Sequence, residues 1–172
     1  MKNYPPRGFT LMELLIYMAA LATVSVLAVN AILIMTKSFG SFKASRALNI
    51  SAFTALERIT GEIRLANDLD GAESIFDASP GQLVLETIDR ETENPAVMEF
   101  ILDNGVIKYQ KDGAGFEPLT VAEAEVSRLI FRKIQNASTS FAVKVEMTVS
   151  AGQGVSRKTE NFYSTAVLRR GY

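Results

Sequence analysis

The sequence contains no cysteine, no histidine and no tryptophan. Their absence excludes disulfides, thiolate nucleophiles, Ser-His and Cys-His pairs, and every nitrogen or sulfur ligand for a metal. A carboxylate pair or a Ser-Lys dyad is still chemically available, but no spacing in the chain indicates either one. We therefore predict that the protein is not an enzyme and carries no cofactor.

An excess of charge of either sign is also missing. The 172 residues have a formal net charge of -1 at pH 7, and no basic stripe of the kind that binds nucleic acid is visible. Nucleic acid is therefore not indicated as a direct partner. The length suits one anchored domain that is stabilised by packing alone.

Charged residues are nearly absent from residues 9–36, where Glu13 is the single exception. A helix of this length rises about 40 Å, which exceeds the hydrocarbon thickness of about 30 Å. We predict a single span with membrane lipid around it, and Lys2 and Arg7 favour a cytoplasmic N-terminus. A secretory signal cut near Ala22 is the alternative, but the apolar stretch continues well beyond that residue.

The carboxylate of Glu13 needs an explanation, because a charge in a membrane helix costs at least a few kcal/mol. Cleavage after Gly8 would create an amino group at Phe9, one turn away, that can pair with it. Glycine before that bond presents no side chain to a protease, and Pro5-Pro6 keeps the preceding segment out of a helix. The alternative is that Glu13 only reaches the headgroup level and has no role in assembly.

The run from Arg7 to Ile16 reads Arg-Gly-Phe-Thr-Leu-Met-Glu-Leu-Leu-Ile and resembles the N-terminal signature of type IV pilin-like proteins. The resemblance implies a leader of residues 1–8 that a prepilin peptidase removes after Gly8, followed by N-methylation of Phe9. It implies that Glu13 acts in assembly, where its carboxylate meets the amine of a neighbouring subunit. The remaining chain would then divide into a transmembrane and assembly helix at residues 9–36 and an extracytoplasmic pilin-like domain at residues 37–172.

Beyond the apolar stretch, an apolar stripe with spacings of three and four residues predicts an amphipathic helix. Its members are Leu48, Ala52, Leu56, Ile59, Ile63 and Ala66. We predict one helix from about Leu11 to Asn67, and its final turns resemble those of J-type minor pseudopilins and large minor pilins. Pilins often carry a proline where this chain has Asn30, so whether the helix kinks or melts there is left open.

After Asp70-Gly71 the apolar period changes to two, which is typical of strands. An Asn104-Gly105 pair between two such runs is a strong hairpin signal. The predicted strands are Gln82–Ile88, Val97–Leu102, Val106–Gln110, Ser127–Ile134, Ser140–Ser150 and Thr159–Arg169. We predict an α+β fold in which the amphipathic half of the helix packs on one antiparallel sheet of five to six strands. The pilin resemblance implies the same architecture.

Two weaker motifs are not assigned. Asp68 to Gly71 alternates oxygen ligands, but an EF-hand loop counted from Asp68 would need glycine where Glu73 stands and an acid where Ser79 stands. No metal site is therefore predicted. Asn49 and Asn136 match the glycosylation pattern, which turns and helix surfaces also produce.

These features favour a structural subunit of a bacterial type II secretion pseudopilus or of a type IV pilus-like filament. The expected subunit is a minor pseudopilin or minor pilin near the filament tip. The resemblance implies four kinds of partner: prepilin peptidase and methyltransferase, other pilins or pseudopilins, the inner-membrane assembly machinery, and lipid before assembly. The precursor would lie in the cytoplasmic membrane with its C-terminal domain outside. The alternative is an anchored extracytoplasmic binding or processing domain that does not polymerise.

Overall fold

The computed structural model describes residues 8–89, 92–135 and 141–168. One long helix, α1 (Leu11–Leu65), is followed by strands and one short 3-10 helix. The strands are β1 (Asp68–Leu69), β2 (Gln82–Ile88), β3 (Pro95–Asp103), β4 (Val106–Lys111), β5 (Glu117–Pro118), β6 (Ala124–Gln135), β7 (Phe141–Ala151) and β8 (Lys158–Val167). This confirms the predicted α+β class, although the helix ends two residues earlier than expected.

The chain divides into two compact units, one that reaches Phe39 and one that begins at Gly40. Within the first unit, α1 continues through Asn30 without a break. It is regular there because asparagine, unlike proline, keeps its backbone donor. This helix is long and apolar enough to span a membrane. Residues 1–7 of the predicted leader lie outside the described part of the chain.

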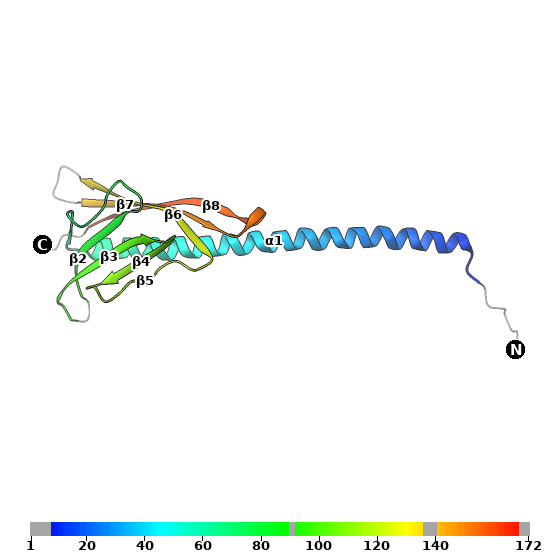
Figure 1. The fold of residues 1–172 in the computed structure, drawn as a ribbon, viewed down its shortest axis with the longest axis horizontal. Coiled ribbons are helices and arrows are strands. Elements are labelled where there is room, and N and C mark those ends of the chain that lie inside the picture. The colour runs from blue at the N-terminus through cyan, green and yellow to red at the C-terminus, as the bar shows by residue number, and fades with distance from the viewer. Residues whose placement is uncertain (1–7, 90–91, 136–140, 169–172) are drawn as a thin grey trace. The chain divides into compact units, whose positions relative to one another are not determined.

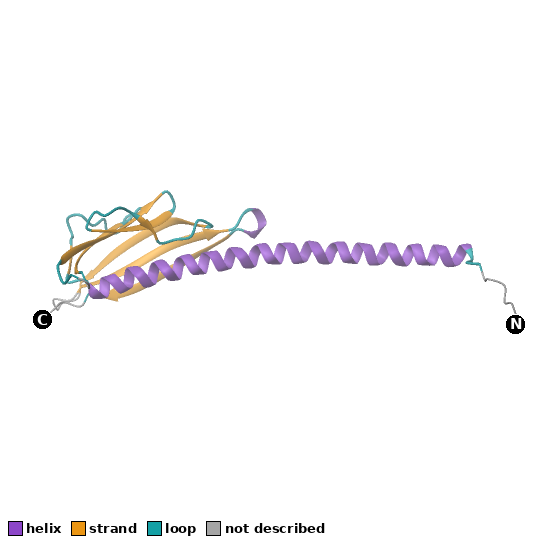
Figure 2. Ribbon diagram, turned by 90° about the horizontal axis from the view of Figure 1, so that it is seen from below, coloured by secondary structure: helices purple, strands orange, loops and turns teal. Residues whose placement is uncertain are grey.

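In the second unit, the apolar stripe of α1 forms the centre of the core. All six predicted stripe residues are buried, and Ala44 and Ala55 extend the stripe. The alanines let the sheets approach the helix closely, while the larger side chains fill the space between strands. Figure 2 shows the strands lying along one side of the last turns of α1.

The strands form two antiparallel sheets, so the prediction of one sheet was wrong. The first sheet has the order β1-β2-β3-β4-β5, and the second has the order β6-β7-β8. The two-residue strands β1 and β5 were not predicted, because so short a run shows no period. In Figure 1, β7 and β8 lie on one flank of α1, β4 and β5 lie on the other, and β6 crosses over the helix between them.

Loop residues that bond to the edge of β6 explain why the two sheets do not join into one. We call this row of contacts, made by Asp77, Gly81 and Gly105, the seam. The outer edge of β6 does not pair with a strand of the first sheet. Instead, the backbone N–H groups of Asp77 and Gly81 donate to the carbonyls of Phe131 and Leu129, both at 2.9 Å. Farther along β6, the Val126 N–H donates to the Gly105 carbonyl at 2.8 Å. Loops therefore satisfy this edge, which a period-two pattern alone cannot predict.

The hairpin predicted at Asn104-Gly105 is confirmed. Both residues have positive φ, 49° and 77°, as a tight two-residue hairpin turn requires. The other predicted strands are present with bounds shifted by a few residues, and the turn predicted at residues 152–154 joins β7 to β8. The predicted strand ends at Ser140 and Arg169 and the motif at Asn136 lie outside the described residues.

Candidate functional site

The Gly8-Phe9 bond lies in exposed, non-helical backbone immediately before α1. A methyl group added at Gly8 would meet no atom within 4 Å. The fold itself therefore does not require a glycine here. This contrasts with Gly40, where the same methyl group would lie 2.9 Å from the Ser156 hydroxyl.

Thr10 caps the helix and positions Glu13 in its first turn. The Thr10 hydroxyl accepts a hydrogen bond from the Glu13 N–H at 3.2 Å, and the Thr10 carbonyl accepts one from the Leu14 N–H at 3.2 Å. The negative carboxylate is thus held at the positive end of the helix dipole.

Two aromatic rings flank the Glu13 side chain. The Tyr17 hydroxyl donates to Glu13 Oε1 at 3.3 Å, and the rings of Phe9 and Tyr17 meet edge to face with centroids 6.3 Å apart. Glu13 and Tyr17 lie four residues apart and so share a helix face, and Phe9, just before the helix, reaches that face through its ring contact with Tyr17. Glu13 is the one half-buried residue among residues 8–39, all of which the structure describes.

The structure therefore places the three sequence-derived site residues, Gly8, Phe9 and Glu13, within about two turns of chain. Thr10 and Tyr17 were missed. A Thr-x-x-Glu capping pattern before an apolar run would have revealed Thr10. The spacing of four residues from Glu13 would have revealed Tyr17.

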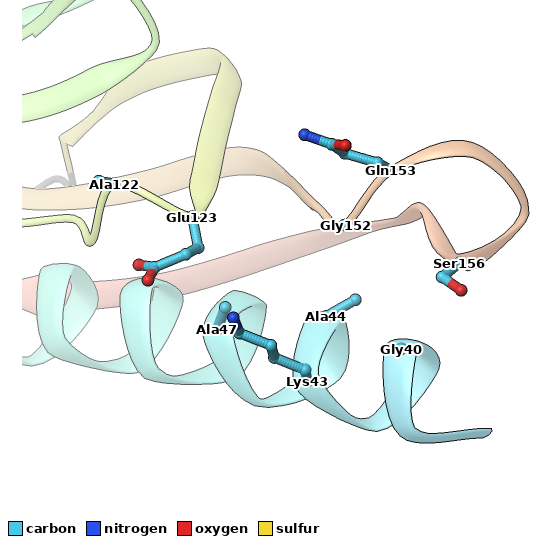
Figure 3. A pocket seen from close by; sticks show the side chains of 9 residues that line it. All are labelled: Gly40, Lys43, Ala44, Ala47, Ala122, Glu123, Gly152, Gln153 and Ser156. Carbon is cyan, nitrogen blue, oxygen red and sulfur yellow. The ribbon is translucent and has the colours of Figure 1, made fainter. Parts of the chain in front are cut away.

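A groove of about 550 Å³ lies in the second unit, between the first turns of its helix, the segment before β6 and the β7-β8 turn. Its walls include Lys43, Ala44, Glu123 and Gln153. Figure 3 shows Glu123 pointing toward the helix and Lys43 lying along it. Gly152 allows the turn to approach, because a methyl group there would lie 2.8 Å from the Ala44 side chain. The groove is open and carries no pattern of catalytic groups.

Acidic side chains do not gather into a metal site. In the part of the chain that the structure describes, no group of three or more acidic side chains is arranged to hold a metal ion. The Asp70 carboxylate instead accepts the backbone N–H groups of Ala72 and Glu73, at 2.8 and 3.1 Å, which closes the turn after β1. The alternating acids at residues 68–70 therefore have a structural use.

No protein-family model, no curated protein and no solved structure matches the chain. The long apolar N-terminal helix, whose second half packs on antiparallel sheets, is compatible with a pilin-like fold. Any assignment of function beyond this architecture depends on the residues at the start of α1.

Proposed function

We propose that this chain is the precursor of a non-catalytic subunit of a pseudopilus or type IV pilus-like filament. The observation that supports the proposal most strongly is the Gly8-Phe9 junction in exposed, non-helical backbone, with Glu13 in the first turn of an apolar helix. A protease needs an accessible peptide that is not held in a helix, and the junction meets both conditions. The fold gives no reason of its own for glycine at this position.

In this proposal the apolar part of α1 anchors the precursor in the cytoplasmic membrane, and Lys2 and Arg7 keep its N-terminus in the cytoplasm. A prepilin peptidase cuts after Gly8 and methylates Phe9. The second unit lies outside, where sibling subunits and the inner-membrane assembly machinery meet it. The subunit is a minor pseudopilin or minor pilin near the filament tip.

The Glu13 carboxylate favours the filament over the lipid bilayer, because it gains a stronger partner there. Before assembly, the Tyr17 hydroxyl is its hydrogen-bond partner. In the filament, the charged amine of a neighbouring subunit replaces this weaker neutral donor, since hydrogen bonds between charged groups are stronger. The carboxylate thereby sets the axial position of one subunit against the next.

Mass spectrometry tests the processing step. Co-expression with an active prepilin peptidase should yield a chain that begins at Phe9 and carries one added methyl group. A Gly8→Val variant should stay intact, because its branched side chain hinders binding of the extended peptide. A Gly71→Val variant should be processed normally, since a methyl group at Gly71 also meets no atom within 4 Å. An intact chain with active peptidase, or a cut after Ala22, would contradict the proposal.

Assembly is tested by producing variants beside the wild-type chain. Glu13→Ala should be processed yet should be at least about tenfold depleted from sheared filaments, because it lacks the partner for the neighbouring amine. Tyr17→Phe should enter filaments, since the amine takes over the place of its hydroxyl. Normal incorporation of Glu13→Ala would show that Glu13 does not act in assembly.

A further inference from the structure

Polar side chains within residues 9–36 are almost all satisfied inside the helix itself. The hydroxyls of Thr23, Ser25 and Thr36 each donate to the carbonyl four residues earlier, at 2.9, 2.8 and 2.9 Å. Glu13 and Tyr17 bond to each other. Asn30 is the exception, because its exposed carboxamide makes no hydrogen bond to any described residue.

An unpaired carboxamide is costly in this position. Asn30 lies about 11 Å from the midpoint of residues 9–36, which is inside the half-thickness of about 15 Å of a hydrocarbon core. Hydrocarbon offers neither a donor nor an acceptor, so the two N–H groups and the carbonyl oxygen of the amide need a protein partner. The partner must come from another helix.

The helix face around Asn30 suits close approach of such a helix. At about 100° per residue, Ala19, Thr23 and Asn30 fall within about 40° of one line along the helix. Ala19 and Thr23 form a small-xxx-small pair, which lets two backbones come together in a membrane. Glu13 lies about 100° around the helix from Asn30, so this face is separate from the proposed assembly face.

We propose that this face, formed by Ala19, Thr23 and Asn30, binds a second copy of the same chain in the membrane. Identical chains with one orientation carry Asn30 at the same depth. Their amides are self-complementary, so each Nδ2 donates to the Oδ1 of the other copy. This proposal rests only on the membrane-spanning part of the proposed function and requires neither cleavage nor a filament.

Disulfide cross-linking in membranes tests this pairing, and the chain contains no native cysteine to interfere. Full-length Thr23→Cys and Ser25→Cys variants form a matched pair, because both hydroxyls bond to the carbonyl four residues earlier. Thr23 lies on the Asn30 face, whereas Ser25 lies about 140° away. In cells without prepilin peptidase or assembly machinery, oxidation with copper-phenanthroline should yield a homodimer from Thr23→Cys and little from Ser25→Cys.

Adding Asn30→Leu to the Thr23→Cys chain should reduce the dimer about three- to tenfold, the range expected for loss of interhelical polar bonds. Asn30→Gln should retain much of the dimer, because it keeps an amide. Equal cross-linking of the two cysteine variants, no effect of Asn30→Leu, or cross-linking only to a different membrane protein would overturn the proposal. A filament defect with the dimer intact would instead count against the filament function alone.

Discussion

Glu146 shows how one residue in the sheet responds to the charges around it. Its carboxylate accepts from Lys144 Nζ at 2.7 Å and from Arg132 Nε at 3.1 Å. The hydrogen bond from Lys144, followed by the one from Arg132, lowers the pKa of Glu146 below its ordinary value. Arg132 also reaches Asp77 at 2.9 Å, so the cluster connects β6 and β7 to the seam loop.

The lowered pKa predicts an acid-sensitive contribution to stability. A carboxylate whose pKa is lower in the folded state stabilises the fold above its ordinary pKa, and this is lost as the pH falls through the folded pKa. Glu146→Gln should therefore destabilise the detergent-solubilised chain at pH 7, and this difference should shrink as the pH falls from the ordinary carboxyl range through the lowered pKa of Glu146. Urea unfolding followed by circular dichroism measures the difference. Glu160→Gln, at an acid without an ion pair among the described residues, should cost less stability at pH 7.

At the level of residues, the sequence predicts those candidate site residues that belong to a short motif of neighbouring positions. Gly8, Phe9 and Glu13 were predicted in this way and stay predictions as functional residues; the structure places them together at the start of α1, where Tyr17 joins them. The pairing of Arg132 with Glu146 was not predicted, because it depends on the register between β6 and β7. That register contains a shift between Val126 and Arg128 that no local pattern reveals.

At the level of elements, α1 was the most predictable part of the molecule. Its two halves show different apolar patterns, continuous in the first and striped in the second, and both patterns persist over many turns. Gly61 does not interrupt the helix, because burial of the stripe outweighs a propensity cost of about 1 kcal/mol. Most strands were also found, since each has a clear alternation.

Two isoleucines on α1 test which face of the helix is buried against the sheets. Ile59 is 0% exposed and Ile50 is 44% exposed. Ile59→Ala should lower the free energy of unfolding by about 2 to 5 kcal/mol, because it leaves a cavity between helix and sheet. Ile50→Ala should cost less than about 1 kcal/mol, as expected for a surface position. Equal losses in urea titrations of the two variants would contradict the assigned face.

At the level of the whole second unit, the division into two sheets could not be predicted. Alternation shows where strands occur but says nothing about which edges pair. The separation depends on the backbone groups of Asp77, Gly81 and Gly105, all in turns or loops. Such contacts join residues far apart in sequence and produce no periodic pattern of apolar residues.

Gly81 lies at this seam and offers a test of it. A methyl group there would lie 3.0 Å from the Leu129 carbonyl oxygen and 3.0 Å from the Phe131 ring. Gly81→Ala should therefore destabilise the unit by about 1 to 3 kcal/mol through overpacking. Gly71→Ala meets no atom within 4 Å and should be neutral or stabilising by up to about 1 kcal/mol. Thermal unfolding of both variants measures the difference in stability. A Gly81→Ala variant as stable as the wild type would show that the seam has room for a methyl group.

The same seam also bears on the order in which the chain can fold. Each sheet is contiguous in sequence, with β1 to β5 within residues 68–118 and β6 to β8 within residues 124–167. The first sheet can therefore pair its strands on the helix while the second is still being synthesised, since domains acquire structure from the N-terminal side. Until β6 arrives, the donors of Asp77 and Gly81 lack their acceptors, and the core stays open on that side. We expect closure of the seam to be the last step, so a chain that stalls before residue 131 would present an incomplete core to chaperones and proteases.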